Sequence, residues 1–157
     1  FSSVASFWAH DAIPDEILRK PGTLTDKERA IMRSHTAKGR EIIDVMLNNF
    51  GLDGLEHIDM LRNIALYHHE AMNGSGYPSG LRGDGIPIEA RIVAVADIFD
   101  ALTSRRSYKE PWSNDDAFAM LRRMAGSQVD QHCVEALIAQ RTEVERIQTR
   151  FKEDPYG

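Results

Sequence analysis

The sequence predicts an all-α fold, a helical bundle. Signals for β-strands are nearly absent, start and stop signals of helices recur along the chain, and apolar residues repeat at helical spacing. The chain of 157 residues is long enough to bury a hydrophobic core, and it shows no internal repeat or linker. We therefore expect residues 1–157 to form a single domain.

The first third of the chain predicts a short helical turn and a long helix. The stretch "AIPDEILRKPGT" predicts the turn, which Pro21 closes. Thr25 and Glu28 form a capping-box pattern that opens a helix over about 26–49. The inward face of this helix is expected to carry Ile31, His35, Ile42 and Met46.

The middle of the chain predicts two helices joined by a glycine-rich loop. The first helix, over about 55–72, ends at Asn73 and Gly74. The second begins after Pro87 with "IEARIVAVADIFDALTS", and because it is apolar on nearly every side we expect it to be the buried centre of the domain. The inward face of the first helix is expected to carry Ile58, Leu61, Ala65 and His68.

The last third predicts two more helices, over about 114–125 and 131–152, with Gly126 between them. Helical spacing within the first of these assigns three side chains to the core: Phe118, Leu121 and Met124.

The composition favours a globular protein of the cytoplasm. Apolar residues make up 42% of the chain, and no apolar run reaches the ~18 residues that span a bilayer. The first residues do not resemble a signal peptide, and the single cysteine, Cys133, cannot form an internal disulfide. The net charge of −5 opposes binding of long nucleic acid, so any phosphate would be bound at a small, locally basic site.

Two aspartates interrupt the apolar helix. Asp97 and Asp100 lie three residues apart and therefore point to one side of it. Carboxylates are almost never fully buried unless they are paired or bound to a metal. One interpretation is a pair of capping or salt-bridged aspartates. The other is that Asp97 binds a metal ion while Asp100 supports the site or the substrate.

Histidines occur on the same inward faces. His35 lies among apolar neighbours, His68 and His69 end a helix, and His10 stands directly before Asp11. Each alone is weak evidence, since buried histidines often only satisfy hydrogen bonds. Together with the aspartates they form an ordered set drawn from several helices, and imidazole with carboxylate is the ligand set of zinc, manganese or iron.

The chain resembles the HD-GYP branch of the HD-domain metal phosphohydrolases. The resemblance rests on "AHD", "SHTAKG", "YHHEAMNGSGYPSGLRGDGIP", "ARIVAVADIFDALTS", "RSYKE" and "GSQVD", in the order of the family, and it covers nearly the whole chain. It implies a helical bundle around two or three metal ions, iron or manganese, with nickel or zinc as alternatives. It further implies cleavage of a cyclic dinucleotide, cyclic di-GMP or 3′,3′-cyclic GMP-AMP, to the linear form and on to mononucleotides.

Mapped by motif, the resemblance also assigns roles to residues. Asp97 or Asp11 would bridge a pair of ions that activates water, and the catalytic set would be Asp97, Asp11 and, in support, Asp100. Arg106 and Lys109 would bind phosphate, although they could equally be ordinary surface charges. The metal ligands that the resemblance implies are His10, Asp11, His35, His68, His69 and Asp97.

The glycine-rich loop has a place in the same site. Gly76 and Gly80 are predicted to adopt backbone angles that a residue with a Cβ atom would resist. Tyr77 would stack on a guanine or fasten the loop. The resemblance implies that this loop contacts diguanylate-cyclase (GGDEF) partners, and the charged last helix would allow a homodimer.

Three departures from the family bear on activity. The family has I-G-K-I between its His-Asp pair and A-I-P-D, whereas Asp11 runs directly into Ala12. A true deletion would displace the pair by more than a helical turn. The upstream metal motif of the family does not fit within "FSSVASFWAHD", which leaves the third ion open. Asn73 replaces an aspartate, which keeps the turn chemistry and loses one negative charge.

Two alternative functions follow. A degenerate module would bind a cyclic dinucleotide or a signalling partner without turnover, and the missing I-G-K-I and upstream motif favour it. A different HD-type nucleotide phosphohydrolase is disfavoured by the intact Gly-Tyr-Pro triplet at 76–78.

Overall fold

The structure of the protein, a computed structural model, contains helices and loops. The parts of the chain that it describes are residues 13–18, 20, 22–51, 57–104 and 110–153. Within them the helices are α2 (Asp15–Leu18), α3 (Asp26–Arg33), α4 (His35–Phe50), α5 (Ile58–Tyr67), η1 (Gly83–Gly85, a 3-10 turn), α6 (Ile88–Thr103), α7 (Asn114–Met124), α8 (Gln131–Ala139) and α9 (Arg141–Glu153). Over the same residues the only strand-like pairing is an isolated bridge between Ala125 and Val129. The all-α prediction is confirmed.

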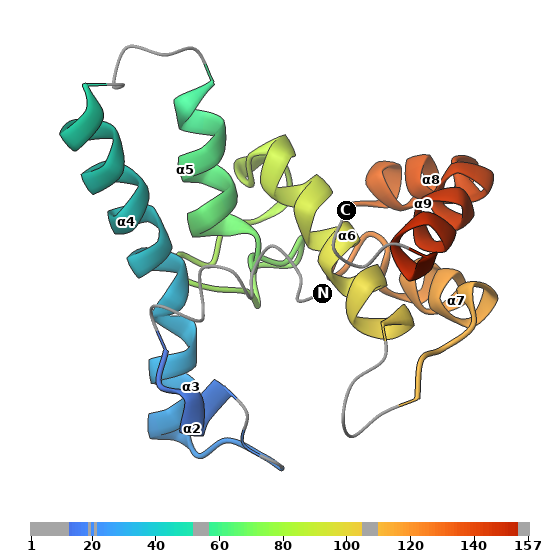
Figure 1. The fold of residues 1–157 in the computed structure, drawn as a ribbon, viewed down its shortest axis with the longest axis horizontal. Coiled ribbons are helices and arrows are strands. Elements are labelled where there is room, and N and C mark those ends of the chain that lie inside the picture. The colour runs from blue at the N-terminus through green and yellow to red at the C-terminus, as the bar shows by residue number, and fades with distance from the viewer. Residues whose placement is uncertain (1–12, 19, 21, 52–56, 105–109, 154–157) are drawn as a thin grey trace.

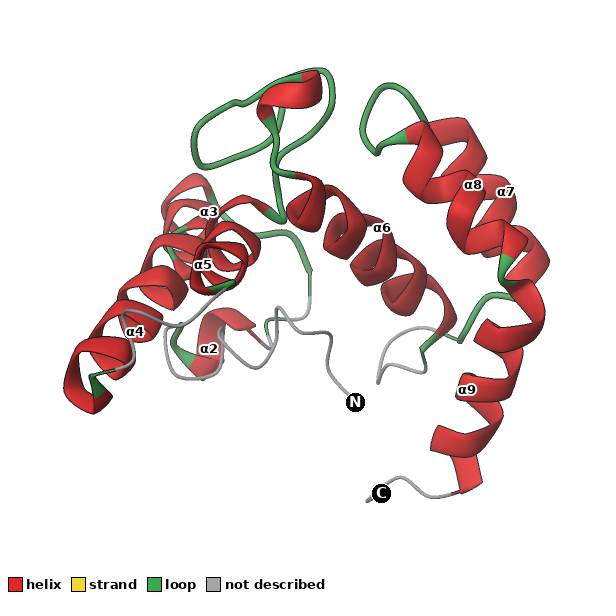
Figure 2. Cartoon of the chain, turned by 90° about the horizontal axis from the view of Figure 1, so that it is seen from above, coloured by secondary structure: helices red, strands yellow, loops and turns green. Residues whose placement is uncertain are grey.

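Helix α6 lies between two groups of helices. An antiparallel hairpin of α4 and α5 stands on one side of it, and α7, α8 and α9 stand on the other (Figures 1 and 2). Helix α6 contacts α5, α7 and α8. The long loop between α5 and α6 folds over the N-terminal end of α6 (Figure 2). Because α4 and α5 run in opposite directions, the start of α4 and the end of α5 meet near this loop.

The two groups have separate apolar cores. The hairpin buries Ile43 and Leu47 of α4 against Ile58 and Ala65 of α5. The larger core joins α6 to α7 and α8 through Val95, Phe99, Ala117, Phe118, Leu121, Val129 and Val134, with Met124 packed against it. The predicted core residues of α7 therefore lie in the core.

The first long helix is in fact two helices that meet at Ser34. The Ser34 hydroxyl donates to the carbonyl of Ile31 at 2.7 Å, a local bond that competes with the helical pattern. The predicted inward face is wrong in part, since Ile31 and Met46 are 39% and 51% exposed and Ile43 and Leu47 are buried instead. Apolar residues occur in adjacent pairs along α4, and only the position of α5 decides which member of each pair is covered.

Two further predicted faces are corrected. Leu61 of α5 is 52% exposed, because the buried side of this helix carries Ile58 and Ala65. Ile92 of α6 is 53% exposed, so α6 is central without being enclosed. Its neighbours cover the sides that carry Ala90, Ala94, Val95 and Phe99. The long C-terminal helix is likewise divided, into α8 and α9, at Gln140.

The capping box of α3 is confirmed. The Thr25 hydroxyl accepts from the amide of Glu28 at 3.3 Å, and the Glu28 carboxylate accepts from the amide of Thr25 at 2.7 Å. Lys20 also donates to Glu28, at 2.7 Å. The hydrogen bond from Lys20, with those from Thr25, lowers the pKa of Glu28 to about 2.

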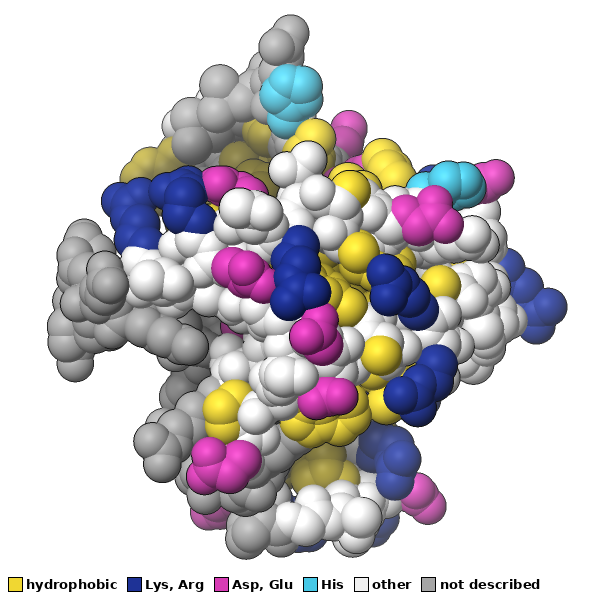
Figure 3. Space-filling model, turned by 90° about the vertical axis from the view of Figure 1, so that its right-hand side faces the viewer, with side chains coloured by type: hydrophobic (Ala, Val, Ile, Leu, Met, Phe, Trp, Pro, Cys, Tyr) yellow, Lys and Arg dark blue, Asp and Glu magenta, His cyan; other side chains and the backbone are white. Residues whose placement is uncertain are grey.

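Charges of both signs are interspersed on the face formed by α7 to α9 (Figure 3). Arg141 pairs with Asp115 at 2.6 Å and with Glu145 at 2.8 Å, and Arg146 pairs with Glu143. This face offers no extended basic surface to a nucleic acid backbone. Among the described residues, the helices are too short or too polar to span a membrane.

Candidate metal centre

Three histidines converge where the hairpin opens toward the loop. His35 is the first residue of α4, His68 follows the last residue of α5, and His69 lies in the turn after it. One ring nitrogen from each lies within 4.8 Å of the others, and the ring centroids are 4.2 to 5.5 Å apart. The chain thus brings together three of the six predicted metal ligands.

Backbone carbonyls fix which ring nitrogen carries the proton. The Nδ1 atom of His35 lies 2.5 Å from the carbonyl oxygen of Met32, and that of His68 lies 2.8 Å from the carbonyl oxygen of Ile64. A carbonyl oxygen can only accept, so Nδ1 is the donor in both rings. The Nε2 atoms of His35 and His68 are buried without a hydrogen-bond partner in the described part of the chain. Each therefore presents an unused lone pair, the state in which imidazole binds a metal.

Burial keeps the cluster uncharged. It lowers the pKa of His35 and of His68, although their backbone hydrogen bonds oppose the shift. Burial, with the proximity of His68 and His35, lowers the pKa of His69 to about 3. Three neutral imidazoles at neutral pH suit a divalent ion such as iron, zinc or nickel. The donor set therefore fits a metal centre.

Tyr77 covers one side of this cluster. Its ring stacks on the ring of His69, with centroids 4.9 Å apart, and the guanidinium of Arg33 lies 5.0 Å from the centre of the Tyr77 ring. Burial raises the pKa of the Tyr77 hydroxyl to about 12, against the effect of Arg33. The loop is therefore fastened to the histidines through an aromatic contact, one of the two roles predicted for Tyr77. Arg33 was not singled out from the sequence.

Glu70 is a second residue that sequence reasoning missed. Its side chain is buried, and its carboxylate accepts from the backbone amides of Ser79 at 2.7 Å and Leu81 at 3.0 Å. A signal was available, because an acidic residue directly precedes a loop rich in glycine, where backbone amides lack regular partners.

The two loop glycines are required for different reasons. Gly80 has φ of +67°, as predicted. The prediction is wrong for Gly76, whose φ does not lie in the left-handed region. A Cβ atom on Gly76 would instead lie 2.5 Å from the Cα atom of Glu70, so only glycine permits this approach of the backbone.

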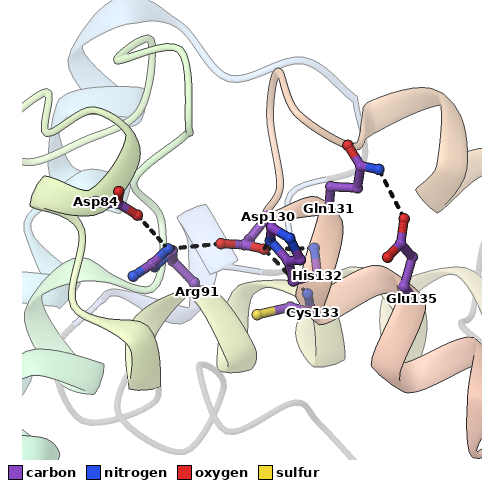
Figure 4. Close-up of polar contacts among 7 residues, drawn as sticks. All are labelled: Asp84, Arg91, Asp130, Gln131, His132, Cys133 and Glu135. Carbon is purple, nitrogen blue, oxygen red and sulfur yellow. Dashed lines mark hydrogen bonds and ion pairs between the residues drawn. The ribbon is translucent and has the colours of Figure 1, made fainter.

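The loop is also attached to the turn between α7 and α8. The amide of Asn73 donates to the carbonyl of Ser127 at 2.8 Å, and the Asn73 side chain bonds both Ser127 and the amide of Ser75. The substitution of asparagine for aspartate therefore keeps the turn chemistry, as predicted. Nearby, Arg91 pairs with Asp84 of the loop at 3.1 Å and with Asp130 at 2.8 Å (Figure 4).

The two aspartates of α6 have different surroundings. Asp97 is partly buried, with its Oδ2 atom out of contact with solvent, but it is not a member of the group of ligand atoms within 4.8 Å of one another. Asp100 accepts from the hydroxyl of Ser104 at 2.7 Å, beside the end of α6. This contact joins two side chains and leaves both interpretations of Asp100 as predictions.

Four predicted site residues lie outside the described residues: His10, Asp11, Arg106 and Lys109. The two remaining histidines, His57 and His132, are exposed and lie outside the cluster. Cys133 is partly buried and belongs to the core around α8 rather than to the histidine cluster.

Comparison with known proteins gives a family match over most of the chain. A family model described as "HD domain" matches residues 6–133. The chain is 48% identical over 140 residues to the "Cyclic di-GMP phosphodiesterase response regulator RpfG" of Xanthomonas campestris pv. campestris. That alignment covers 89% of this chain and 35% of the relative.

Two other relatives carry related names. The chain is 42% identical over 142 residues to a "Cyclic di-GMP phosphodiesterase" of Thermotoga maritima, covering 90% of this chain and 37% of that protein. It is 42% identical over 127 residues to "3'3'-cGAMP-specific phosphodiesterase 2" of Vibrio cholerae serotype O1, covering 81% of this chain and 23% of that protein. The chain thus spans from about a quarter to a third of the length of these relatives.

Proposed function

This chain belongs to the HD-domain family, and on that premise we propose that it is a metal-dependent phosphodiesterase acting on a cyclic dinucleotide. The substrate would be cyclic di-GMP or 3′,3′-cyclic GMP-AMP, and the product the linear dinucleotide and then mononucleotides. The observation that carries the proposal is the cluster of His35, His68 and His69, in which two buried Nε2 atoms have no hydrogen-bond partner among the described residues.

The histidines would hold the metal, and other residues would complete its ligands. His10, Asp11 and Asp97 are proposed as further ligands, with two or three ions of iron or manganese and with zinc or nickel as alternatives. When bound, the ions supply a Lewis acid for the phosphoryl oxygen and acidify the attacking water. The buried Nδ1 bonds of His35 and His68 keep both rings in the orientation and tautomer that a metal requires.

Cations and an aromatic ring would bind the rest of the substrate. Arg106 and Lys109 are proposed to bind phosphate, the former in a bidentate manner and the latter as a point charge. Tyr77 lies on the His69 ring and could present its exposed part to a guanine base. Asp100, which accepts from the hydroxyl of Ser104, is proposed to support the site or the substrate. Contact of the loop with a GGDEF partner and formation of a homodimer stay predictions.

The proposal is tested by turnover of metal-loaded protein. Protein loaded with manganese or iron is incubated with cyclic di-GMP and with cyclic GMP-AMP, and the linear product is separated by chromatography. Changing a group that merely supports a metal ligand costs about 10–100-fold in affinity or activity. We therefore expect His68→Ala and Asp97→Ala to lower turnover by more than about 100-fold. His132→Ala, at an exposed histidine outside the site, should retain activity.

One experiment separates the enzyme from a degenerate binding module. Inserting Ile-Gly-Lys-Ile between Asp11 and Ala12 restores the spacing of the family. If the missing four residues inactivate the site, the parent protein binds the nucleotide without cleaving it. The variant with the insertion then gains turnover. Turnover by the parent that His68→Ala leaves unchanged would refute the proposed centre.

A further inference from the structure

Glu70 is adjacent in sequence to the proposed metal ligands His68 and His69, but its carboxylate bonds the loop and does not join the histidine cluster. It follows His69 directly, and its side chain is 5% exposed. Its carboxylate is not part of the group of ligand atoms formed by the three histidines. Both of its oxygens are instead used by the loop, one by the amide of Ser79 and the other by the amide of Leu81.

The loop folds back on the segment that carries Glu70. The amide of Tyr77 donates to the carbonyl of His69 at 3.1 Å, and Gly76 approaches the backbone of Glu70 and Ala71 too closely for a Cβ atom. Loop residues 76, 77, 79 and 81 therefore all contact the segment 69–71. The result places the Tyr77 ring on the ring of His69.

We propose that Glu70 is a positioning residue, which holds the loop over His69 and so sets the place of Tyr77 against the substrate. It acts through the loop and does not touch metal or substrate. The effect on turnover rests on the proposed function, whereas the effect on the loop does not.

A carboxylate is suited to this task because it accepts and does not donate. Two amide donors point at two acceptor oxygens, and such bonds to a charged acceptor are stronger than bonds between neutral groups. Glutamine has almost the same shape, but its NH₂ group would face one of the two amides. That amide would lose its acceptor, so the loop should move to regain one.

Glu70→Gln in the metal-loaded protein provides the test. We expect the amides of Ser79 and Leu81 to exchange hydrogen at least about tenfold faster, because a buried bond to a charged group is lost. Metal content per chain should be unchanged. KM for the cyclic dinucleotide should rise about tenfold while kcat changes little, as when ground-state and transition-state binding are lost equally. A residue that only stabilised the fold would lower the active fraction and leave KM unchanged.

The matched control is Glu89→Gln. Glu89 is partly buried on α6 and accepts from the side chain of Asn63 at 2.7 Å, a bond that glutamine can keep. This variant should leave exchange of the loop amides, metal content and KM unchanged.

Gly76→Ala tests the same contact from the other side. It keeps the carboxylate but forces the loop away from Glu70, so it should reproduce the faster exchange and the higher KM. Loss of metal in Glu70→Gln but not in Gly76→Ala would make Glu70 a ligand and overturn the inference. Unchanged exchange in Glu70→Gln, or failure of both variants to fold, would also overturn it. Wild-type protein without turnover would refute the proposed function, and exchange would still decide the role of Glu70.

Discussion

Each buried imidazole of the cluster has one nitrogen bound to the backbone and one open toward its neighbours. For His35 and His68 the carbonyls of Met32 and Ile64 hold the Nδ1 proton, so the Nε2 lone pairs point into the cluster. A protonated ring would place a buried charge beside two other rings, which is why the pKa values are lowered. A metal ion can therefore bind at neutral pH without displacing protons from these rings.

The lowered pKa values of these histidines predict that the free energy of unfolding of the metal-free protein depends on pH. The folded pKa of His69 is about 3, below its ordinary value of 6.5, so the unfolded chain binds more protons between these values. The stability is fully present above pH 6.5 and is lost as the pH falls toward 3. Between pH 7 and 5 we expect the free energy of unfolding to fall by about 1–2 kcal/mol through His69, and the lowered pKa values of His35 and His68 act in the same direction.

Urea unfolding at pH 7, 6 and 5 measures this dependence. His69→Gln removes one titrating ring and should reduce the slope, whereas His132→Gln, at an exposed site, should not. A stability that is independent of pH over this range would mean that folding does not lower the pKa values of these rings.

At the scale of elements, the hairpin of α4 and α5 assembles the site. Its antiparallel course puts the first residue of α4 beside the residue after α5, so His35 and His68 meet although they are distant in sequence. Helix α3 leads into α4, and the break at Ser34 lets Arg33 reach the Tyr77 ring. The capping box of Thr25 and Glu28 sets the start of α3, so a substitution in it tests how much this helix start contributes to stability.

Thr25→Ala should destabilise the protein by about 1 kcal/mol, since it removes the side-chain acceptor of the helix start. Thr142→Ala, at an exposed position within α9, is the matched control and should be close to neutral. Because the pKa of Glu28 is lowered from 4.5 to about 2, its part in the box is present above pH 4.5 and is lost between these values. Thermal unfolding of both variants measures the difference, and equal melting temperatures would contradict the role of the cap.

At the scale of the whole molecule, the loop joins the two groups of helices. It leaves the hairpin at the histidines and contacts the turn before α8 through Asn73 and Ser127. Arg91 of α6 links Asp84 of the loop to Asp130 at the start of α8 (Figure 4). Asp130 in turn accepts from the amides of the first turn of α8. The site is thus supported by contacts from the opposite side of α6.

Asp130→Asn is expected to destabilise the protein by roughly 3 kcal/mol, because it leaves Arg91 partly buried without its main partner. Burial would raise the pKa of Asp130, but the bonds from Cys133, Arg91 and His132 outweigh it and hold the pKa below its ordinary value. The stabilisation is therefore present at neutral pH and is lost as the pH falls through that lowered value. Glu143→Gln breaks an exposed pair and should leave the stability nearly unchanged. Equal effects of the two substitutions on denaturant unfolding would contradict this contrast.

Sequence alone predicted the helices well where a local signal marks their ends. The capping box at Thr25, the proline before α6 and the apolar spacing of α7 all act within a few residues, so they survive in any tertiary context. The breaks at Ser34 and Gln140 and the exposed sides of Ile92 and Leu61 were not predicted. The exposed sides depend on which neighbouring helix covers them, whereas the break at Ser34 accompanies a local hydrogen bond of its hydroxyl.

For the site, the amino-acid sequence determined the chemistry and the tertiary structure decided the geometry. Ligand type and motif order predicted His35, His68 and His69 as metal ligands, and the structure brings these three imidazoles together. The structure added the bound Nδ1 atoms, the stack of Tyr77 on His69 and the turn of Glu70 toward the loop. The stack of Tyr77 and the turn of Glu70 cannot be inferred from spacing, since both depend on groups brought close only when the loop folds back on residues 69–71.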